Sequence, residues 1–195
     1  MTETADSLRI PPSLYLVALL PPEPVFSAVW AMKQEIHERT GSRNAVRLPP
    51  HITLIPPLRL RASEFEPLAL PALAAFAAGQ HPFRVGLHDF AWFGHRTLFV
   101  HVSDDSALQT FHRTLTAWCR QHLPAVPREK RAFTAHMTLA TRDLPPDQVP
   151  ALKLEFAQRS FQAQFEVGSF ALFRHNGRQW EAIAEFHLGS GAAGL

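Results

Sequence analysis

Short apolar runs alternate with amphipathic stretches along the first half of the chain. Residues 13–20, SLYLVALL, are continuously apolar and are followed by PPEP, a pattern that predicts a short buried strand. In residues 24–41 the apolar positions recur at helical spacing, and Gly41 predicts the helix C-terminus. Residues 45–55, AVRLPPHITLI, predict a second extended segment. Prolines recur through residues 56–82, and this pattern predicts a loop followed by a short alanine-rich helix.

The second half of the chain repeats this alternation of extended and helical patterns. In residues 106–123 the apolar positions Leu108, Phe111 and Leu115 fall on one helical stripe, and Ser103 or Asp104 could cap that helix. Asn176–Gly177 predicts a hairpin turn near the end of the chain. The expected elements are strands at 83–94, 97–103 and 131–141, helices at 106–123 and within 144–159, two strands within 161–188, and a frayed tail at 189–195.

Two segments of the chain share one order of elements. Residues 13–54 and 98–139 each run strand, helix, strand, and each ends in the same motif, HITL at His51 and HMTL at His136. The repeat predicts two similar lobes related by a pseudo-twofold axis. Equivalent strands would then face each other across a cleft, with one histidine on each side.

The two motifs place a histidine and a threonine on the same side of a strand. Side chains two residues apart in a strand project from one face, so His51 lies beside Thr53 and His136 beside Thr138. A histidine with a threonine two positions later is a weak signal, since the composition predicts about 0.6 such pairs in this chain. An apolar middle residue and a following leucine lower the expectation to roughly 0.03, so coincidence is a poor explanation.

Composition limits the classes of protein that remain. The 195 residues, 46% of them hydrophobic, can build one domain or two small lobes, and we treat 1–195 as a single domain. A formal charge of +2 does not indicate a long duplex-binding surface, although a short anionic ligand is compatible with it. The single cysteine, Cys119, excludes an internal disulfide. Without a signal-peptide profile or an apolar run of roughly 20 residues, we expect a cytoplasmic monomer with no membrane partner.

Paired histidines can bind a metal, can be structural groups beside the sheet, or can carry out acid–base chemistry, and the last of these is the strongest interpretation. Zinc sites need three or four ligands, and no carboxylate lies close to either motif, so we expect no metal and no cofactor. Two opposed imidazoles suit in-line displacement at phosphorus, because one can remove a proton while the other supplies one. The threonine hydroxyls could donate to the non-bridging phosphate oxygens. Additional substrate contacts could come from the basic residues Arg59, Lys130, Arg131 and Arg142.

The motifs PPHITLIPPL and AHMTLATR, together with the segment FALFRHNGRQWEAIAEF, resemble the 2H phosphoesterase superfamily, in particular the bacterial 2′–5′ RNA ligase-like (LigT-like) proteins. The resemblance covers about residues 13–187. It implies an α+β fold with two pseudo-symmetric lobes, antiparallel sheets around a central cleft, and helices on the outside. It also implies a metal-independent enzyme that acts on 2′,3′-cyclic phosphate ends of RNA or nucleotides, with 2′–5′ ligation as a side or reverse activity.

The resemblance assigns His51 and His136 as the acid–base pair and Thr53 and Thr138 as phosphate donors. Many LigT-like proteins carry an arginine five positions after the second histidine, where this chain has Thr141. That departure weakens the assignment of Arg142. Candidate aromatic residues for stacking on a base are Tyr15, Trp92, Phe93, Phe133 and Phe173.

Two questions stay open at this point. The sequence does not say which histidine acts as acid and which as base. A non-catalytic module that binds the phosphate of RNA or of a nucleotide is the alternative to an enzyme, and buried structural histidines are a third interpretation.

Overall fold

The computed structural model describes residues 11–189, which form eight strands, four α-helices and one short 3₁₀ helix. The strands are β1 (Ser13–Leu19), β2 (Ile52–Leu60), β3 (Phe83–Phe93), β4 (Thr97–Asp104), β5 (His136–Thr141), β6 (Gln162–Val167), β7 (Ser169–His175) and β8 (Trp180–His187). The helices are α1 (Val25–Thr40), η1 (Arg43–Ala45), α2 (Ala62–Ala78), α3 (Ser106–His122) and α4 (Val149–Phe156).

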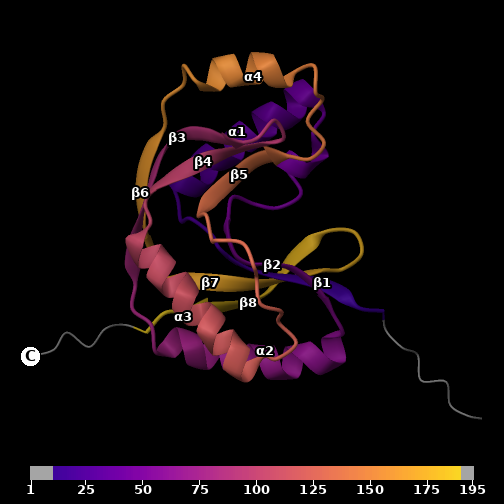
Figure 1. The fold of residues 1–195 in the computed structure, drawn as a ribbon, viewed down its shortest axis with the longest axis vertical. Helices are drawn as coiled ribbons and strands as arrows, with labels where there is room; N and C mark the ends of the chain where they lie inside the picture. Colours follow the sequence, from indigo (N-terminus) through magenta and orange to yellow (C-terminus); the bar gives the residue numbers. More distant parts are fainter. Residues whose placement is uncertain (1–10, 190–195) are drawn as a thin grey trace, which may run out of the picture.

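All eight strands belong to one antiparallel sheet in the order β6-β3-β4-β5-β2-β1-β7-β8. The two central strands, β5 and β2, pair at a single position, Ile52 opposite Met137. The sheet therefore consists of two four-stranded halves that separate on either side of this one pair (Figure 1). The predicted α+β class with antiparallel sheets and outer helices is confirmed, and the two expected sheets are the halves of one curled sheet.

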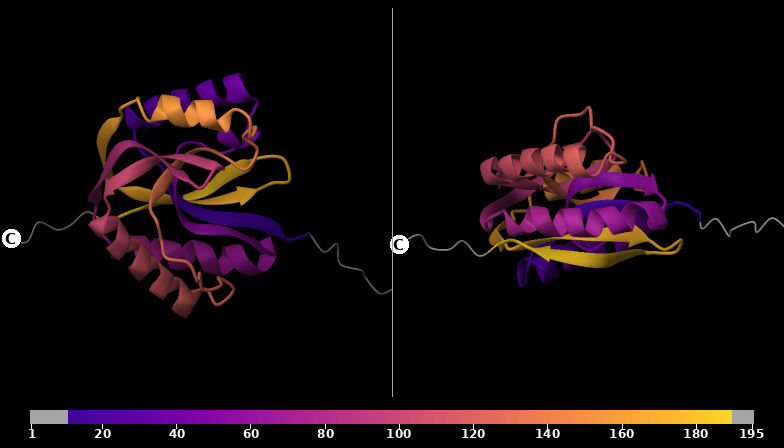
Figure 2. Two further views of the ribbon diagram at one scale, coloured as in Figure 1. Left: turned by 45° about the horizontal axis from the view of Figure 1, so that its top comes forward. Right: turned by 90° about the horizontal axis from the view of Figure 1, so that it is seen from below.

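The helices pack on the outside of the two halves. Helices α1 and α4 lie together on the upper half, where Arg39 of α1 forms an ion pair with Glu155 of α4 at 2.6 Å. Helices α2 and α3 lie side by side across the lower half (Figures 1 and 2). One large core beneath the sheet includes buried residues from all four α-helices. None of the helices in residues 11–189 combines the length and apolar character needed to cross a bilayer.

The two strand-helix-strand segments occupy equivalent places in the two halves. Strand β2 lies at the inner edge of the lower half with β1 beside it, and β5 lies at the inner edge of the upper half with β4 beside it. The two inner strands meet at the pair Ile52 and Met137. Both of these side chains are fully buried, so they anchor the inner strands in the core below the sheet.

The expectation for residues 56–82 was wrong in extent. Strand β2 continues through Pro56 and Pro57, because its register with β1 shifts there and the missing amide hydrogens break no regular ladder. Helix α2 then runs for 17 residues despite Pro67 and Pro71 in its interior. Its buried side chains, Phe65 and Phe76 among them, pack into the core, and this packing outweighs the unfavourable helix propensity of proline.

Residues 161–188 form three strands where two were expected. The chain leaves the upper half after Val167 and enters the lower half at Ser169, with Gly168 between them. The two flanking segments look like one continuous strand in the sequence because a single glycine is the only break between them. Of the tail at 189–195, only Gly189 falls within the described residues.

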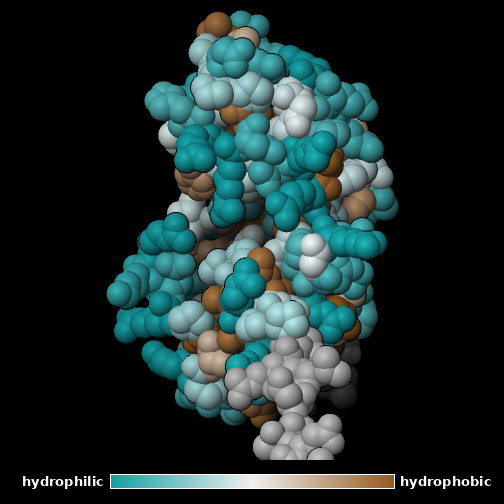
Figure 3. Space-filling model, turned by 90° about the vertical axis from the view of Figure 1, so that its right-hand side faces the viewer, coloured by the Kyte–Doolittle hydropathy of each residue, from teal (hydrophilic) through white to brown (hydrophobic). Residues whose placement is uncertain are grey.

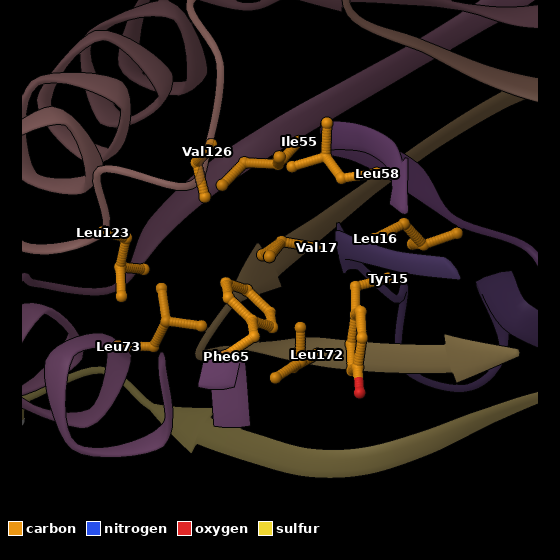
Figure 4. A pocket seen from close by; sticks show the side chains of 10 residues that line it. All are labelled: Tyr15, Leu16, Val17, Ile55, Leu58, Phe65, Leu73, Leu123, Val126 and Leu172. Atoms are coloured by element: carbon orange, nitrogen blue, oxygen red, sulfur yellow. The ribbon is translucent and has the colours of Figure 1, made fainter. Parts of the chain in front are cut away.

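The core of the lower half contains a small apolar cavity between the sheet and helix α2. Ten side chains line it (Figure 4), including Phe65 and Leu73 from α2 and Leu172 from β7. The Tyr15 hydroxyl points away from the other lining side chains and donates to Glu66 Oε1 at 2.6 Å. Burial and this carboxylate raise the pKa of Tyr15, so its hydroxyl is a structural hydrogen-bond donor.

Candidate active site

The pairing of β2 with β5 brings both histidine–threonine motifs to the same face of the sheet. Ile52 and Met137 point into the core, so the flanking residues His51, Thr53, His136 and Thr138 point to the opposite, concave face. The antiparallel register sets His51 near Thr138 and Thr53 near His136. The structure thus brings together the four residues that the sequence singles out.

Both histidines are held by the same local hydrogen bond. Nδ1 of His51 donates to the carbonyl of Pro49 at 2.7 Å, and Nδ1 of His136 donates to the carbonyl of Thr134 at 2.7 Å. A carbonyl can only accept, so each neutral ring carries its proton on Nδ1 and presents the Nε2 lone pair. Each ring can therefore accept a proton at Nε2, or donate one from Nε2 once it is charged.

The two rings differ in burial and in the charge around them. His51 is 9% exposed, whereas His136 is partly exposed. Burial, with smaller contributions from Lys33 and His136, lowers the pKa of His51 to about 4. Burial also lowers the pKa of His136. The register places the two rings diagonally across the β2–β5 pair, on the same face of the sheet.

Aromatic side chains flank His136 on the upper half. Phe99 of β4 pairs with Thr138 across the sheet, and Phe93 of β3 stacks on Phe99 with ring centroids 4.2 Å apart. The Phe93 ring also meets the His136 ring edge to face at 4.9 Å. Phe93 is 40% exposed, which makes it an open aromatic surface beside the site. In the lower half, Phe173 is covered by its neighbours and only 3% exposed.

Two further polar residues adjoin the site and were not predicted to belong to it. His101 of β4 is the direct cross-strand partner of His136 and is exposed. Lys33 of α1 is 1% exposed, and its Nζ donates to the carbonyl of Thr138 at 3.0 Å. The sequence signal for Lys33 is its position, because it lies on the buried stripe of α1 with Val29 and Ile36.

The four basic residues proposed as substrate contacts lie in different parts of the fold. Arg59 and Arg142 are at the far ends of β2 and β5, and Arg142 is roughly 20 Å along the chain from His136. Lys130 and Arg131 are exposed in the loop before β5, where the Arg131 side chain faces Glu129 at 3.4 Å. No hydrogen bond or ion pair joins any of these four to the histidines in the part of the chain that the structure describes.

The backbone of Arg142 forms a turn directly after β5. Its backbone has φ = 64°, and its amide donates to the carbonyl of Arg96 at 3.3 Å. Arg96 in turn donates to the carbonyl of Arg142 at 3.4 Å. The exposed side chains of Arg96 and Arg142 place positive charge at the rim of the upper half.

A space-filling view shows where a ligand could enter. The molecule narrows between its two halves, and a hollow crosses its surface there, bordered mainly by hydrophilic residues (Figure 3). Within residues 11–189, no group of three or more histidine, cysteine, aspartate or glutamate side chains is arranged to hold a metal ion.

Comparisons with known proteins agree with the fold. A family model described as the 2′-5′ RNA ligase superfamily matches residues 21–179. The crystal structure of TT0787 of Thermus thermophilus is 23% identical, with a TM-score of 0.69 over 91% of this chain and 99% of that chain. Escherichia coli LigT complexed with 3′-AMP is 16% identical, with a TM-score of 0.62 over 91% of this chain and 98% of that chain.

The same LigT protein has also been crystallised with NADP+, with ATP and with phosphate. No curated protein matches this chain. The structural neighbours share the fold over nearly their whole length, and the family model covers both histidine motifs. The chain therefore has a LigT-like fold and belongs to the 2′-5′ RNA ligase superfamily.

Proposed function

We propose that this protein is a metal-independent phosphoesterase that opens 2′,3′-cyclic phosphate ends of RNA or nucleotides by two-histidine acid–base catalysis. The observation that carries the proposal is the matched pair of Nδ1 hydrogen bonds, which leaves one Nε2 from each half of the sheet for chemistry. Membership of a family of RNA ligases and phosphoesterases supports the reaction class.

The proposed reaction is an in-line displacement at phosphorus. A water molecule attacks the phosphorus atom and gives its proton to Nε2 of the neutral histidine. The bond from phosphorus to the ribose 3′-oxygen breaks, and the charged histidine donates its Nε2 proton to that oxygen. The product carries a 2′-phosphate and a free 3′-hydroxyl. A 5′-hydroxyl in place of water gives a 2′–5′ linkage by the same proton transfers.

Thr53 and Thr138 would stabilise the charge that builds up on phosphorus. Each hydroxyl shares a face with its own histidine and lies near the histidine of the other half. A five-coordinate phosphorus between the imidazoles would present non-bridging oxygens to both hydroxyls, which can donate to them.

Phe93 would hold the base of the terminal nucleotide. The ring is partly exposed, is supported from behind by Phe99, and adjoins His136. Stacking on an aromatic side chain binds any base, because every base has a π face. We therefore expect the site to accept different bases and to lose affinity when Phe93 is replaced by alanine.

The direct test is to incubate the protein, with EDTA present, with an oligoribonucleotide that ends in a 2′,3′-cyclic phosphate and, separately, with a 2′,3′-cyclic mononucleotide. We expect a 2′-phosphate from at least one of them, with no 3′-phosphate. The variants His51→Ala and His136→Ala should each lower turnover by at least about 100-fold. His187→Ala, the same change at an exposed residue at the end of β8, is the matched control and should leave turnover unchanged.

Two results would overturn this function. Full activity in both single-histidine variants would remove the chemistry from this site. Binding of 2′,3′-cyclic mononucleotide by wild-type protein, weakened in the variants but never followed by product, would identify a binding module instead of an enzyme.

A further inference from the structure

A third histidine lies on the concave face of the upper half, beside the candidate catalytic pair. His101 of β4 is the direct cross-strand partner of His136, so the two side chains project from the same face with their Cβ atoms about 5 Å apart. The residues on either side of it in the chain, Val100 and Val102, are buried in the core. This alternation of burial along β4 places the His101 ring on the side of the sheet that carries the site.

Nothing in the described fold occupies the His101 imidazole. The Nδ1 atoms of His51 and His136 both bond backbone carbonyls, whereas His101 is exposed and forms no hydrogen bond, ion pair or ring contact within residues 11–189. Its two ring nitrogens are therefore available to a ligand. The neutral ring can donate a hydrogen bond from one nitrogen, and the charged ring can donate from both.

The carboxylate on the neighbouring strand is already engaged by other groups. Strand β3 has a bulge opposite His101, and the bulged residues are His88 and Asp89. The Asp89 carboxylate accepts from the Phe161 amide at 2.9 Å and lies 3.2 Å from the His88 ring. On its other side His101 adjoins His136, so two imidazoles that can donate to an anion lie next to each other on this face.

The ligand that fits this arrangement is a nucleotide with phosphate on two sides of its ribose. In the proposed function the cyclic phosphate lies between His51 and His136, and the base lies on Phe93. Neighbouring strands are about 4.8 Å apart, so His101 is displaced from His136 by roughly the width of one ribose. Phe99, which supports Phe93, and His101 are successive side chains on this face of β4. A base on Phe93 and a group at His101 would therefore leave the ribose in different directions.

We propose that His101 is a specificity-determining residue that donates a hydrogen bond to the 5′-phosphate of the terminal nucleotide. The preferred substrate is then an RNA end, in which a phosphodiester occupies the 5′-oxygen, and not a 2′,3′-cyclic mononucleotide with a free 5′-hydroxyl. A phosphate contact positions the nucleotide without selecting its base. The inference rests on the proposed function and names its substrate class.

Binding of two product analogues tests this contact without catalysis. Adenosine 2′,5′-bisphosphate carries the 5′-phosphate that 2′-AMP lacks. In calorimetric titrations we expect wild-type protein to bind the bisphosphate at least about tenfold more tightly than 2′-AMP. His101→Ala should lose most of this preference and bind 2′-AMP within about twofold of wild type.

His88→Ala is the matched control for that measurement. It makes the same change at an exposed histidine of the same half, one strand farther from His136, and should keep the preference for the bisphosphate. Equal affinity of wild-type protein for the two analogues would overturn the inference. A preference that survives in His101→Ala would overturn it as well.

Turnover tests the same contact in the reaction. Adenosine 2′,3′-cyclic phosphate and its 5′-phosphorylated form differ only in the phosphate that His101 would bind. We expect kcat/KM of wild-type protein to be at least about tenfold higher for the phosphorylated form, mainly through KM, and His101→Ala to open the two substrates equally well. If wild-type protein opened neither substrate, the proposed function would fail, whereas the binding of the two analogues would still decide the role of His101.

Discussion

At the scale of single residues, the site combines equal hydrogen bonding with unequal surroundings. His51 and His136 each donate Nδ1 to the carbonyl two residues earlier, so both rings have the same tautomer and the same free nitrogen. Only His51 is nearly enclosed, at 9% exposed. The repeated motif thus supplies two imidazoles with the same free nitrogen, Nε2, and the two rings differ in how deeply they are buried.

The burial of His51 makes the protein sensitive to acid. The pKa of His51 is about 4 in the folded protein and about 6.5 when the chain is unfolded, so between these values the unfolded state binds more protons. Stability should therefore fall as the pH drops from 6.5 toward 4, by up to about 3 kcal/mol from this residue. Urea unfolding of wild type and His51→Gln at pH values of about 7.5, 6.0 and 4.5 measures this loss of stability.

The difference in pH dependence between wild type and His51→Gln separates the contribution of His51 from those of carboxylates that also titrate in acid. One such carboxylate is Glu35, whose pKa is lowered to about 2 by the hydrogen bond from Arg159. We expect the free energy of unfolding to depend less on pH in His51→Gln than in wild type. Equal pH dependence in the two proteins would contradict the low pKa of His51.

The threonines predict an effect on rate without an effect on folding. Thr53→Val and Thr138→Val keep the shape of the side chain and remove the hydroxyl donor, and we expect each to lower turnover of the cyclic phosphate by about 10- to 100-fold. Thr114→Val on the exposed side of α3 is the control. Wild-type turnover in both site variants, measured with the melting temperature unchanged, would exclude the threonines from the reaction.

The sequence was sufficient to predict that His51 and Thr53 share one face of their strand, as do His136 and Thr138, because the period of a strand fixes which residues share a face. It was not sufficient for Lys33. A lysine in an amphipathic helix normally extends to solvent, and its burial here depends on a carbonyl in a strand more than 100 residues away. The distances of Arg59 and Arg142 from the site likewise follow from strand length, which the motif alone does not reveal.

At the scale of secondary-structure elements, helix α2 shows how packing overrides local preference. Proline removes one helical hydrogen bond and crowds the preceding turn, so the prolines in residues 56–82 predicted a loop. In the folded protein, Pro67 and Pro71 lie on the exposed side of α2 while Phe65, Leu73 and Phe76 fill the core. Core contacts of this kind join distant segments and are not visible in a local pattern.

One of the two interior prolines of α2, Pro71, therefore predicts a stabilising substitution. Pro71→Ala restores a backbone donor and relieves the crowding, and after the entropy that alanine returns to the unfolded chain we expect a gain of about 1–2 kcal/mol. Chemical unfolding measures the change. Pro82→Ala, outside any helix, is the control and should not stabilise the protein. A loss of stability in Pro71→Ala would mean that the proline is required by the packing of α2.

At the scale of the whole molecule, the two halves of the sheet meet at one residue pair, and the candidate site bridges them. A phosphate bound between His51 and His136 would contact both halves and would stabilise the folded state by mass action. A 2′-nucleotide at about 100 times its dissociation constant should add about 2.7 kcal/mol to the free energy of unfolding. Thermal unfolding with increasing 2′-AMP measures this gain.

The double variant His51→Ala/His136→Ala provides the comparison for that measurement. It should fold and lose the ligand-dependent rise in melting temperature. An equal rise in the double variant would place the nucleotide elsewhere on the protein.

The order of strands in the sheet also determines when the site can form during synthesis. Strand β2, which follows His51, is supported by β1, and β1 is completed by β7 and β8 from the end of the chain. A ribosome that has made residues up to Thr141 has made both histidine motifs, but it has not made β7, the strand that flanks β1. The edge of β1 in the emerging chain therefore has no partner strand until β7 is translated, so the lower half that carries His51 is completed only after both histidine motifs have been made.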